Sequence, residues 1–223
     1  MLSTMSTPAR APEDRADPTS DTTSGPTSDT TSDTTSATAH RLLEAAAEAF
    51  ADRGFHATTT RDIASRAGLS PAGVYVHFSS KEELLYQLSR EGHEAARDML
   101  VAAAAGAGSP TEALRAIMGT FSRWHAEHFR VARIVQYEFG NLTPEHRDAV
   151  LALRKQIDAV VRDVVTAGVA SGEFSVDDVP DTTLALMSMA VDVARWYDPE
   201  IKRTPAAIGD AYADLGIRLV TAR

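Results

Sequence analysis

The chain contains no cysteine, so disulfide bonds and thiolate chemistry are excluded. It has no apolar run near the roughly 20 residues that span a bilayer, and its N-terminus has no signal-peptide hydrophobic stretch. We therefore expect a protein of the cytoplasm that does not associate with membranes. Aromatic residues make up only 6% of the chain, but hydrophobic residues reach 43% over 223 residues, which is enough for a substantial core.

The signatures of catalysis are also missing. The sequence has no Ser–His–Asp order, no glycine-rich phosphate loop and no His-Glu-x-x-His zinc motif. His125 and His128 share a helix face, but no third metal ligand accompanies them, so we expect no metal ion and no cofactor. An enzyme built on a helical bundle is therefore disfavoured, and we expect a protein that is not an enzyme.

The formal net charge of -9 is unusual for a protein that binds nucleic acid, but the charge is unevenly distributed. Residues 1–37 carry two basic and six acidic side chains, whereas residues 38–90 carry six of each. An acidic remainder limits indiscriminate adsorption to phosphate while a less acidic region makes specific contacts. Charge alone does not indicate DNA binding, so a motif has to support that function.

Residues 1–38 form a low-complexity segment that is rich in Ser, Thr, Asp, Pro and Gly and has little to bury. We predict that this segment is a disordered tail. It is either an acidic arm that modulates binding or a dispensable extension. Beyond it we predict a small helical domain at residues 39–85 and a larger helical body at residues 86–223.

The spacing of apolar residues predicts helices almost throughout residues 39–222, and no segment shows the period of two that marks a strand. The predicted fold class is therefore all-α. Four helix-start signals, with capping-box spacing or a cap followed by proline, are Ser79 with Glu82, Ser109 with Glu112, Thr143-Pro144 and Thr204-Pro205. The predicted helices are 39–53, 60–67, 71–77, 81–104, 110–126, 128–139, 144–171, 179–198 and 205–222.

The segment after the first predicted helix has the pattern of two short helices joined by a tight turn. Thr59 or Thr60 caps the first of them, Gly68 supplies the positive φ that ends it, and Ser70 caps the second. Val74 faces inward, which leaves small and polar residues on the opposite side. A helix this short, with such a face, is able to enter the major groove of DNA.

Residues 40–88 resemble the DNA-binding domain of the tetracycline-repressor (TetR) family. The matching residues follow the family pattern in order and are Thr60, Ile63-Ala64, Ala67-Gly68, Gly73-Val74-Tyr75, His77-Phe78 and Lys81. The resemblance implies an N-terminal three-helix domain with a helix-turn-helix, which binds double-stranded operator DNA. It also implies that the body binds a small-molecule effector and forms a homodimer.

Individual DNA contacts follow from the same resemblance. It places Thr60, Ser70, Tyr75 and Lys81 on the phosphate backbone and Ala72, Gly73 and His77 at or beside base edges, with Arg61 as a further contact. The alternative for Tyr75 and His77 is that they only pack against neighbouring residues. Because residues 71–78 contain no Arg or Asn, we expect part of the specificity to come from DNA shape or from apolar contact with thymine methyl groups.

The predicted helices at 179–198 and 205–222 would form the dimer interface if the family pattern holds, although the same residues are equally compatible with an intramolecular core. A ligand cavity needs apolar walls and a few polar groups. The residues that we predict to bind the ligand are Met118, Phe121, Trp124, His128, Tyr137, Met187, Asp192, Arg195 and Trp196. For each of them, core packing or a surface ion pair is the competing explanation.

The stretch from Val193 to Pro199, which contains Arg195-Trp196-Tyr197, is similar to one in actinobacterial TetR regulators that sense acyl-CoA thioesters. The predicted function is therefore a repressor that a small-molecule ligand, such as an acyl-CoA or another lipophilic or anionic metabolite, releases from a palindromic operator. The alternative is a helix-turn-helix protein that is regulated by a protein partner and has no small-molecule inducer.

Overall fold

The computed structural model describes the backbone of residues 29–221 and the side chains of residues 36–221. Within these residues the chain is helical and has no strand, which confirms the all-α prediction. The elements are α1 (Asp29–Arg53), α2 (Thr60–Arg66), α3 (Pro71–Tyr75), α4 (Lys81–Ala105), α5 (Pro110–Glu127), α6 (Phe129–Tyr137), the 3-10 turn η1 (Phe139–Asn141), α7 (Pro144–Ser171), α8 (Val179–Trp196) and α9 (Pro205–Thr221).

The first helix begins earlier than predicted. We expected a disordered tail to run to residue 38, but α1 starts at Asp29, so residues 29–38 are helical. No glycine or proline lies between Pro26 and Gly54, so no helix-breaking residue stops α1 from extending toward the N-terminus. Residues 1–28, which carry the rest of the predicted tail, lie outside the described residues.

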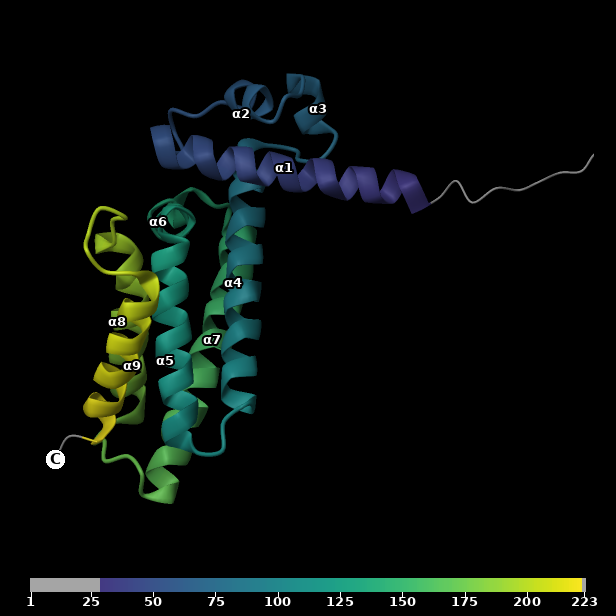
Figure 1. The fold of residues 1–223 in the computed structure, drawn as a ribbon. Coiled ribbons are helices and arrows are strands. Elements are labelled where there is room, and N and C mark those ends of the chain that lie inside the picture. Colours follow the sequence, from purple (N-terminus) through teal and green to yellow (C-terminus); the bar gives the residue numbers. More distant parts are fainter. Residues whose placement is uncertain (1–28, 222–223) are drawn as a thin grey trace, which may run out of the picture.

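The short helices α2 and α3 pack on α1, and these three helices form the head of the molecule. Figure 1 shows α1 lying across one end of the remaining helices, with α2 and α3 on its far side. The head core is made mainly of α1–α4 side chains, and it is completed by Ile134, Leu142 and Val150 from α6, the loop before α7, and α7 itself. The head is therefore packed directly on the body.

The body consists of α4–α9, most of which run side by side away from the head (Figure 1). Helix α4 starts at the head and continues along most of the bundle, packing against α7 and α5. Helices α5 and α9 approach most closely at two glycines, because a Cβ added to Gly209 would lie only 2.6 Å from the backbone oxygen of Gly119. Within the described range, no helix is long and apolar enough to cross a membrane.

The predicted helix starts agree with the structure at three of four positions. Ser109 and Thr143 cap α5 and α7 through their side-chain oxygens, and Thr204 accepts a hydrogen bond from Ala207 N at the start of α9. The fourth prediction is wrong by one residue, because Ser80, not Ser79, caps α4 by accepting from Glu83 N. Two adjacent serines followed by two glutamates satisfy the capping spacing in either register.

Candidate functional site

The turn between α2 and α3 is specified by local chemistry. Thr59 caps α2 in a capping box with Asp62, so of the two threonines considered it is Thr59 that caps. Gly68 has φ +68°, which L-residues rarely adopt, and Ser70 caps α3 by accepting from Gly73 N. The two short helices are thereby fixed relative to each other before any contact with the body is considered.

The head presents half of the eight predicted DNA-contact residues to solvent. Arg61, Ser70, Ala72 and Tyr75 are exposed, whereas Thr60, Gly73, His77 and Lys81 are half-buried. The hydroxyl of Tyr75 lies 3.2 Å from Oγ1 of Thr60, so a hydrogen bond joins α3 to the first residue of α2. Tyr75 is 56% exposed, which places its ring on the surface and not in the core.

Sequence reasoning overlooked Val76. This residue follows α3 directly and is 78% exposed, next to the exposed ring of Tyr75. A β-branched apolar side chain at this position offers methyl groups to a partner surface, and water is a poor environment for it. Its position in the motif, between two residues already proposed to contact DNA, was the signal that could have identified it.

Lys81 is engaged differently from the prediction. Its Nζ donates to the backbone oxygens of Phe55 (2.6 Å) and Thr58 (2.8 Å), with a longer contact to His56 O (3.4 Å), and it lies 4.3 Å from the centre of the Phe55 ring. An ammonium group has three hydrogens to donate. These contacts brace the loop between α1 and α2, and partial burial lowers the pKa of Lys81. The side chain thus has a supporting role within the protein, and its predicted contact with phosphate stays a prediction.

The body contains a cavity of about 330 Å³ between helices α4, α5, α6, α7 and α8. Its walls are largely apolar and include Phe121, Trp124, Val135, Ile157 and Met187. Its polar groups come from a small set of side chains, which are His93, His125, Gln136, Arg154, Asp158 and Ser188. Apolar walls with a few polar groups are the usual composition of a small-molecule site.

Three of the nine predicted ligand-binding residues line this cavity, namely Phe121, Trp124 and Met187. The other six do not. Met118 is fully buried in the body core, and the exposed His128 stacks on Trp124 at 4.7 Å. Tyr137 is 62% exposed and lines a separate hollow between α1 and α6.

The remaining predicted residues lie at the C-terminal end of α8 and do not line the cavity. Asp192 and Arg195 form an exposed ion pair at helical spacing, which was the competing explanation for both. Trp196 packs near Tyr212 of α9 instead of lining the cavity. The cause is the register of α8, because residues such as Met187 and Ala190 occupy its inward face. The C-terminus of α8 is held by Arg133, whose guanidinium donates to the carbonyl oxygens of residues 194, 195 and 197.

Sequence reasoning missed the charged groups of the cavity, Arg154 and Asp158. Both line the cavity and lie next to the buried residues Leu153, Ile157 and Val161 of α7, but Arg154 is half-buried whereas Asp158 is exposed. Charges four residues apart on a helix are normally read as a surface ion pair. The usable signal was that these two charges fall at the spacing of the apolar face.

Two histidines of the cavity are held in the neutral form. Nδ1 of His93 lies 2.6 Å from Ser89 O, and its Nε2 accepts a hydrogen bond from Nε of Arg154 at 3.1 Å, so the proton is on Nδ1. Burial lowers the pKa of His93. Burial also lowers the pKa of His125 to about 4, and its Nδ1 contacts Phe121 O at 2.9 Å.

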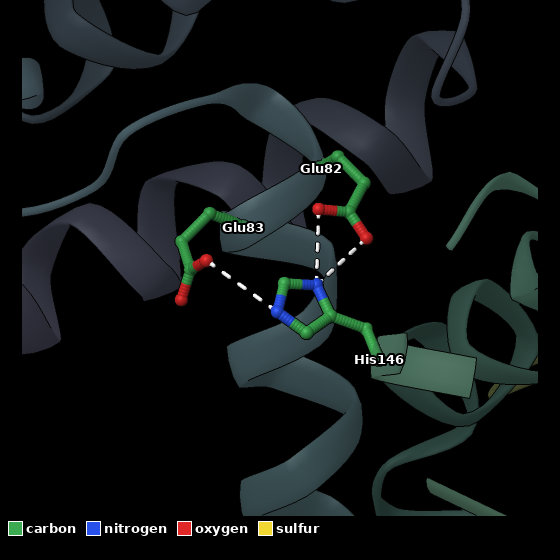
Figure 2. Close-up of side chains that lie close together, drawn as sticks. All are labelled: Glu82, Glu83 and His146. Carbon is green, nitrogen blue, oxygen red and sulfur yellow. Dashed lines mark hydrogen bonds and ion pairs between the residues drawn. The ribbon is translucent and has the colours of Figure 1, made fainter. Parts of the chain in front are cut away.

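Helices α4 and α7 are also joined close to the head, where His146 lies between two glutamates (Figure 2). Nδ1 of His146 is 2.9 Å from Glu82 Oε1, Nε2 is 3.8 Å from Glu83 Oε2, and the ring stacks on Tyr86 at 3.8 Å. These three side chains carry atoms that are able to bind a metal ion, and the atoms lie within 4.8 Å of one another. However, the glutamates face different ring nitrogens and do not converge on one point. The cluster therefore fits a link between helices better than a metal site.

The comparisons with known proteins agree with this architecture. Residues 42–88 match the family model described as bacterial regulatory proteins, tetR family. Residues 107–220 match the model described as the tetracyclin repressor-like C-terminal domain. Together the two models span most of the head and of the body, and the gap between them falls mainly in α4.

Individual relatives have the same character. The HTH-type transcriptional repressor KstR2 of Mycobacterium tuberculosis is 34% identical over 178 residues, covering 77% of this chain and 86% of the relative. A tetR-family regulatory protein from Rhodococcus RHA1 has a TM-score of 0.79 at 34% identity, covering 83% and 98%. The structure of the ketosteroid transcriptional regulator KstR2 of Mycobacterium tuberculosis has a TM-score of 0.75 at 28% identity, covering 83% of this chain and 95% of that chain. This chain belongs to the TetR family of DNA-binding transcriptional regulators and is not an enzyme.

Proposed function

We propose that this protein is a homodimeric repressor that binds a palindromic operator through its head and is released when a small molecule fills the cavity of the body. The observation that carries this proposal is the course of α4. The helix begins at Lys81, which braces the head, and it carries His93 into the cavity. A ligand in the cavity therefore contacts the element that positions the DNA-reading helix.

The proposed DNA surface is the exposed side of α2 and α3. The phosphate contacts come from Arg61 and from Tyr75, whose hydroxyl is hydrogen-bonded to Thr60. The bases are contacted by Ala72, Gly73 and His77. The small residues bring the backbone of α3 close to the DNA. Val76 adds an apolar group suited to a thymine methyl, in keeping with the lack of Arg and Asn in this helix.

The proposed dimer surface lies on α8 and α9. Leu184, Leu215 and Leu219 are 66%, 44% and 40% exposed, although they lie on helices whose other faces are buried in the body. Large apolar side chains grouped on neighbouring helices favour association with a second apolar surface. A twofold dimer would place two heads on successive major grooves, about 34–36 Å apart.

The proposed switch is a shift between a DNA-competent and an incompetent state. For a nearly complete switch, the ligand must favour the incompetent state by about 5.5 kcal/mol. The apolar walls of the cavity suit a lipophilic ligand, in line with the ketosteroid regulator to which the chain is similar. Arg195 forms an exposed ion pair with Asp192 and does not line the cavity. We therefore do not propose a contact between Arg195 and an acyl-CoA.

The test is fluorescence anisotropy with a labelled duplex from the DNA upstream of the protein's own gene, against a scrambled duplex of equal composition. We expect selective binding, and we expect Tyr75→Ala to weaken it by about tenfold or more. Tyr137→Ala, which removes an equally exposed tyrosine outside the head, is the matched control and should bind as the wild type does. Two results would contradict the proposal. One is equal affinity for the upstream and the scrambled duplex together with no selective binding to other genomic fragments, and the other is an unchanged operator affinity in Tyr75→Ala.

A further inference from the structure

The cavity contains an arginine with unused donors. Nε of Arg154 donates to His93, and its guanidinium carbon lies 4.3 Å from the centre of the Phe139 ring. Its two terminal nitrogens make no hydrogen bond or ion pair with any side chain or backbone group among residues 36–221. Asp158 attracts the guanidinium electrostatically but is not paired with it. The cavity wall thus holds a half-buried cation whose flat outer edge is free.

The charge inside the cavity limits what this edge can bind. Arg154 is the one cation among the lining residues when His93 and His125 are neutral, and Asp158 is the one acid. A cavity of this charge disfavours a dianionic or polyphosphate group, which would need several cations. A planar carboxylate matches the two terminal nitrogens of a guanidinium and carries only one charge.

We propose that the cavity binds a small molecule that has an apolar part and a single carboxylate group, and that this carboxylate binds both terminal nitrogens of Arg154. The proposal rests on the proposed function, because it names the effector class of the same cavity. The apolar body would lie against the apolar walls of the cavity, which include Phe121, Ile157 and Met187. A volume of about 330 Å³ is at the small end for ligand sites and suits a medium-chain or compact acid.

The position of Arg154 also explains how a bound carboxylate affects the DNA-binding end of the molecule. The hydrogen bonds that join α4 to α7 include His93–Arg154 in the cavity and Glu82–His146 beside the head (Figure 2). Arg97–Gln156 is a further one, at the surface. A carboxylate that draws Arg154 toward itself competes with the bond to His93. The resulting shift between α4 and α7 is transmitted to the first turn of α4, which adjoins the recognition helix.

The experiment is isothermal titration calorimetry of the full chain with sodium decanoate, 1-decanol and decanoyl-CoA. We expect decanoate to bind the wild type, and Arg154→Met to weaken this binding by roughly tenfold or more, because a charge-assisted bidentate contact is lost. Lys155→Met removes a cation from the exposed side of the same helix and should leave decanoate binding unchanged. The affinity for 1-decanol should be similar in all three proteins.

Several results would overturn the proposal. They are an unchanged decanoate affinity in Arg154→Met, equal binding of decanol and decanoate by the wild type, tighter binding of decanoyl-CoA than of decanoate, or no binding of decanoate at millimolar concentration. If Arg154→Met does not fold by circular dichroism, Arg154→Lys replaces it. This variant keeps the charge but loses the planar fork, so decanoate should bind several-fold more weakly.

Operator binding, measured on the same proteins, separates this proposal from the proposed function. Arg154→Met also loses the bond to His93, so it should bind the operator more weakly than the wild type does, and decanoate should no longer change its operator affinity. Selective operator binding without decanoate binding refutes the carboxylate proposal alone. Decanoate binding that depends on Arg154, without selective DNA binding, refutes the repressor function and leaves the ligand class supported.

Discussion

The head and the body of this protein are organised by different kinds of interaction. In the head, single residues with special backbone chemistry fix each turn, as Thr59, Gly68 and Ser70 do. In the body, the arrangement depends on contacts between residues distant in sequence, such as Gly119 with Gly209 and His93 with Arg154. A function that rests on local chemistry is visible in the sequence, whereas one that rests on distant contacts needs the fold.

The two regions are nevertheless physically joined. Ion pairs and hydrogen bonds link Arg130 to Asp52 and Glu138 to the backbone N–H of Phe55, and body residues complete the head core. Both tryptophans, Trp124 and Trp196, lie in the body. Tryptophan fluorescence therefore reports on the body, while circular dichroism reports on both regions. Comparing the two signals shows whether a change in one region is confined to it.

The largest effect is expected from Gly209→Ala in the body. The added Cβ would meet the backbone of Gly119 at 2.6 Å and Arg123 Cβ at 3.1 Å, so α5 and α9 would have to separate. Overpacking of this kind should lower the free energy of unfolding by about 3 kcal/mol. Urea denaturation followed by fluorescence and circular dichroism measures it.

The matched control is Gly92→Ala in α4, where a Cβ would have nothing within 4 Å. Because alanine is the better helix former, this variant should be more stable than the wild type by up to about 1 kcal/mol. Equal stability of Gly209→Ala and the wild type would contradict the close approach of α5 and α9.

A second effect, of intermediate size, is a loss of stability in mild acid. Burial lowers the pKa of His125 to about 4 in the folded protein, compared with 6.5 as its ordinary value. Between these values the unfolded chain binds the proton more readily, so stability falls as the pH falls through this window. From pH 7 to pH 5, His125 alone should cost about 2 kcal/mol.

The measurement is the free energy of unfolding from urea denaturation at several pH values between 7 and 5. His125→Leu removes the titrating group and should flatten the dependence on pH. The lowered pKa of His93 adds a remaining slope of the same sign. An identical slope in His125→Leu and the wild type would show that His125 does not control acid stability.

The contrast between local interactions in the head and distant contacts in the body also explains which features the sequence could predict. The helix boundaries and the helix-turn-helix follow from caps, glycines and apolar spacing, and most were predicted within two residues of the observed ones. The start of α1 was not, because Ser- and Thr-rich residues after Asp29 carry no signal that distinguishes a tail from a helix extension.

The cavity was harder to predict than the head. Phe121, Trp124 and Met187 were identified because large apolar residues on amphipathic helices face inward. Arg154 was missed because its neighbour across the cavity, His93, comes from another helix far away in the sequence. Arg195 was selected because it interrupts an apolar helix, but its partner Asp192 lies one turn away on the surface.

The smallest effect is expected from Lys81, and it separates two roles that the sequence motif does not distinguish. Lys81→Met removes the donor that holds Phe55 O and Thr58 O but keeps most of the side-chain volume. Since the lysine is partly exposed, the stability loss should be about 1 kcal/mol. Operator affinity should fall modestly, because the loop before α2 loses its brace.

The salt dependence of operator binding distinguishes a brace from a phosphate contact. A lost phosphate contact reduces the slope of log affinity against log salt concentration by about 0.9. We expect this reduction for Arg61→Met, whose exposed side chain makes no ion pair among the described residues. For Lys81→Met we expect an unchanged slope, because the ammonium is already bound to protein carbonyls. An equal reduction of the slope in both variants would show that Lys81 contacts phosphate. The head would then use this position of the motif to bind DNA and not to support the loop.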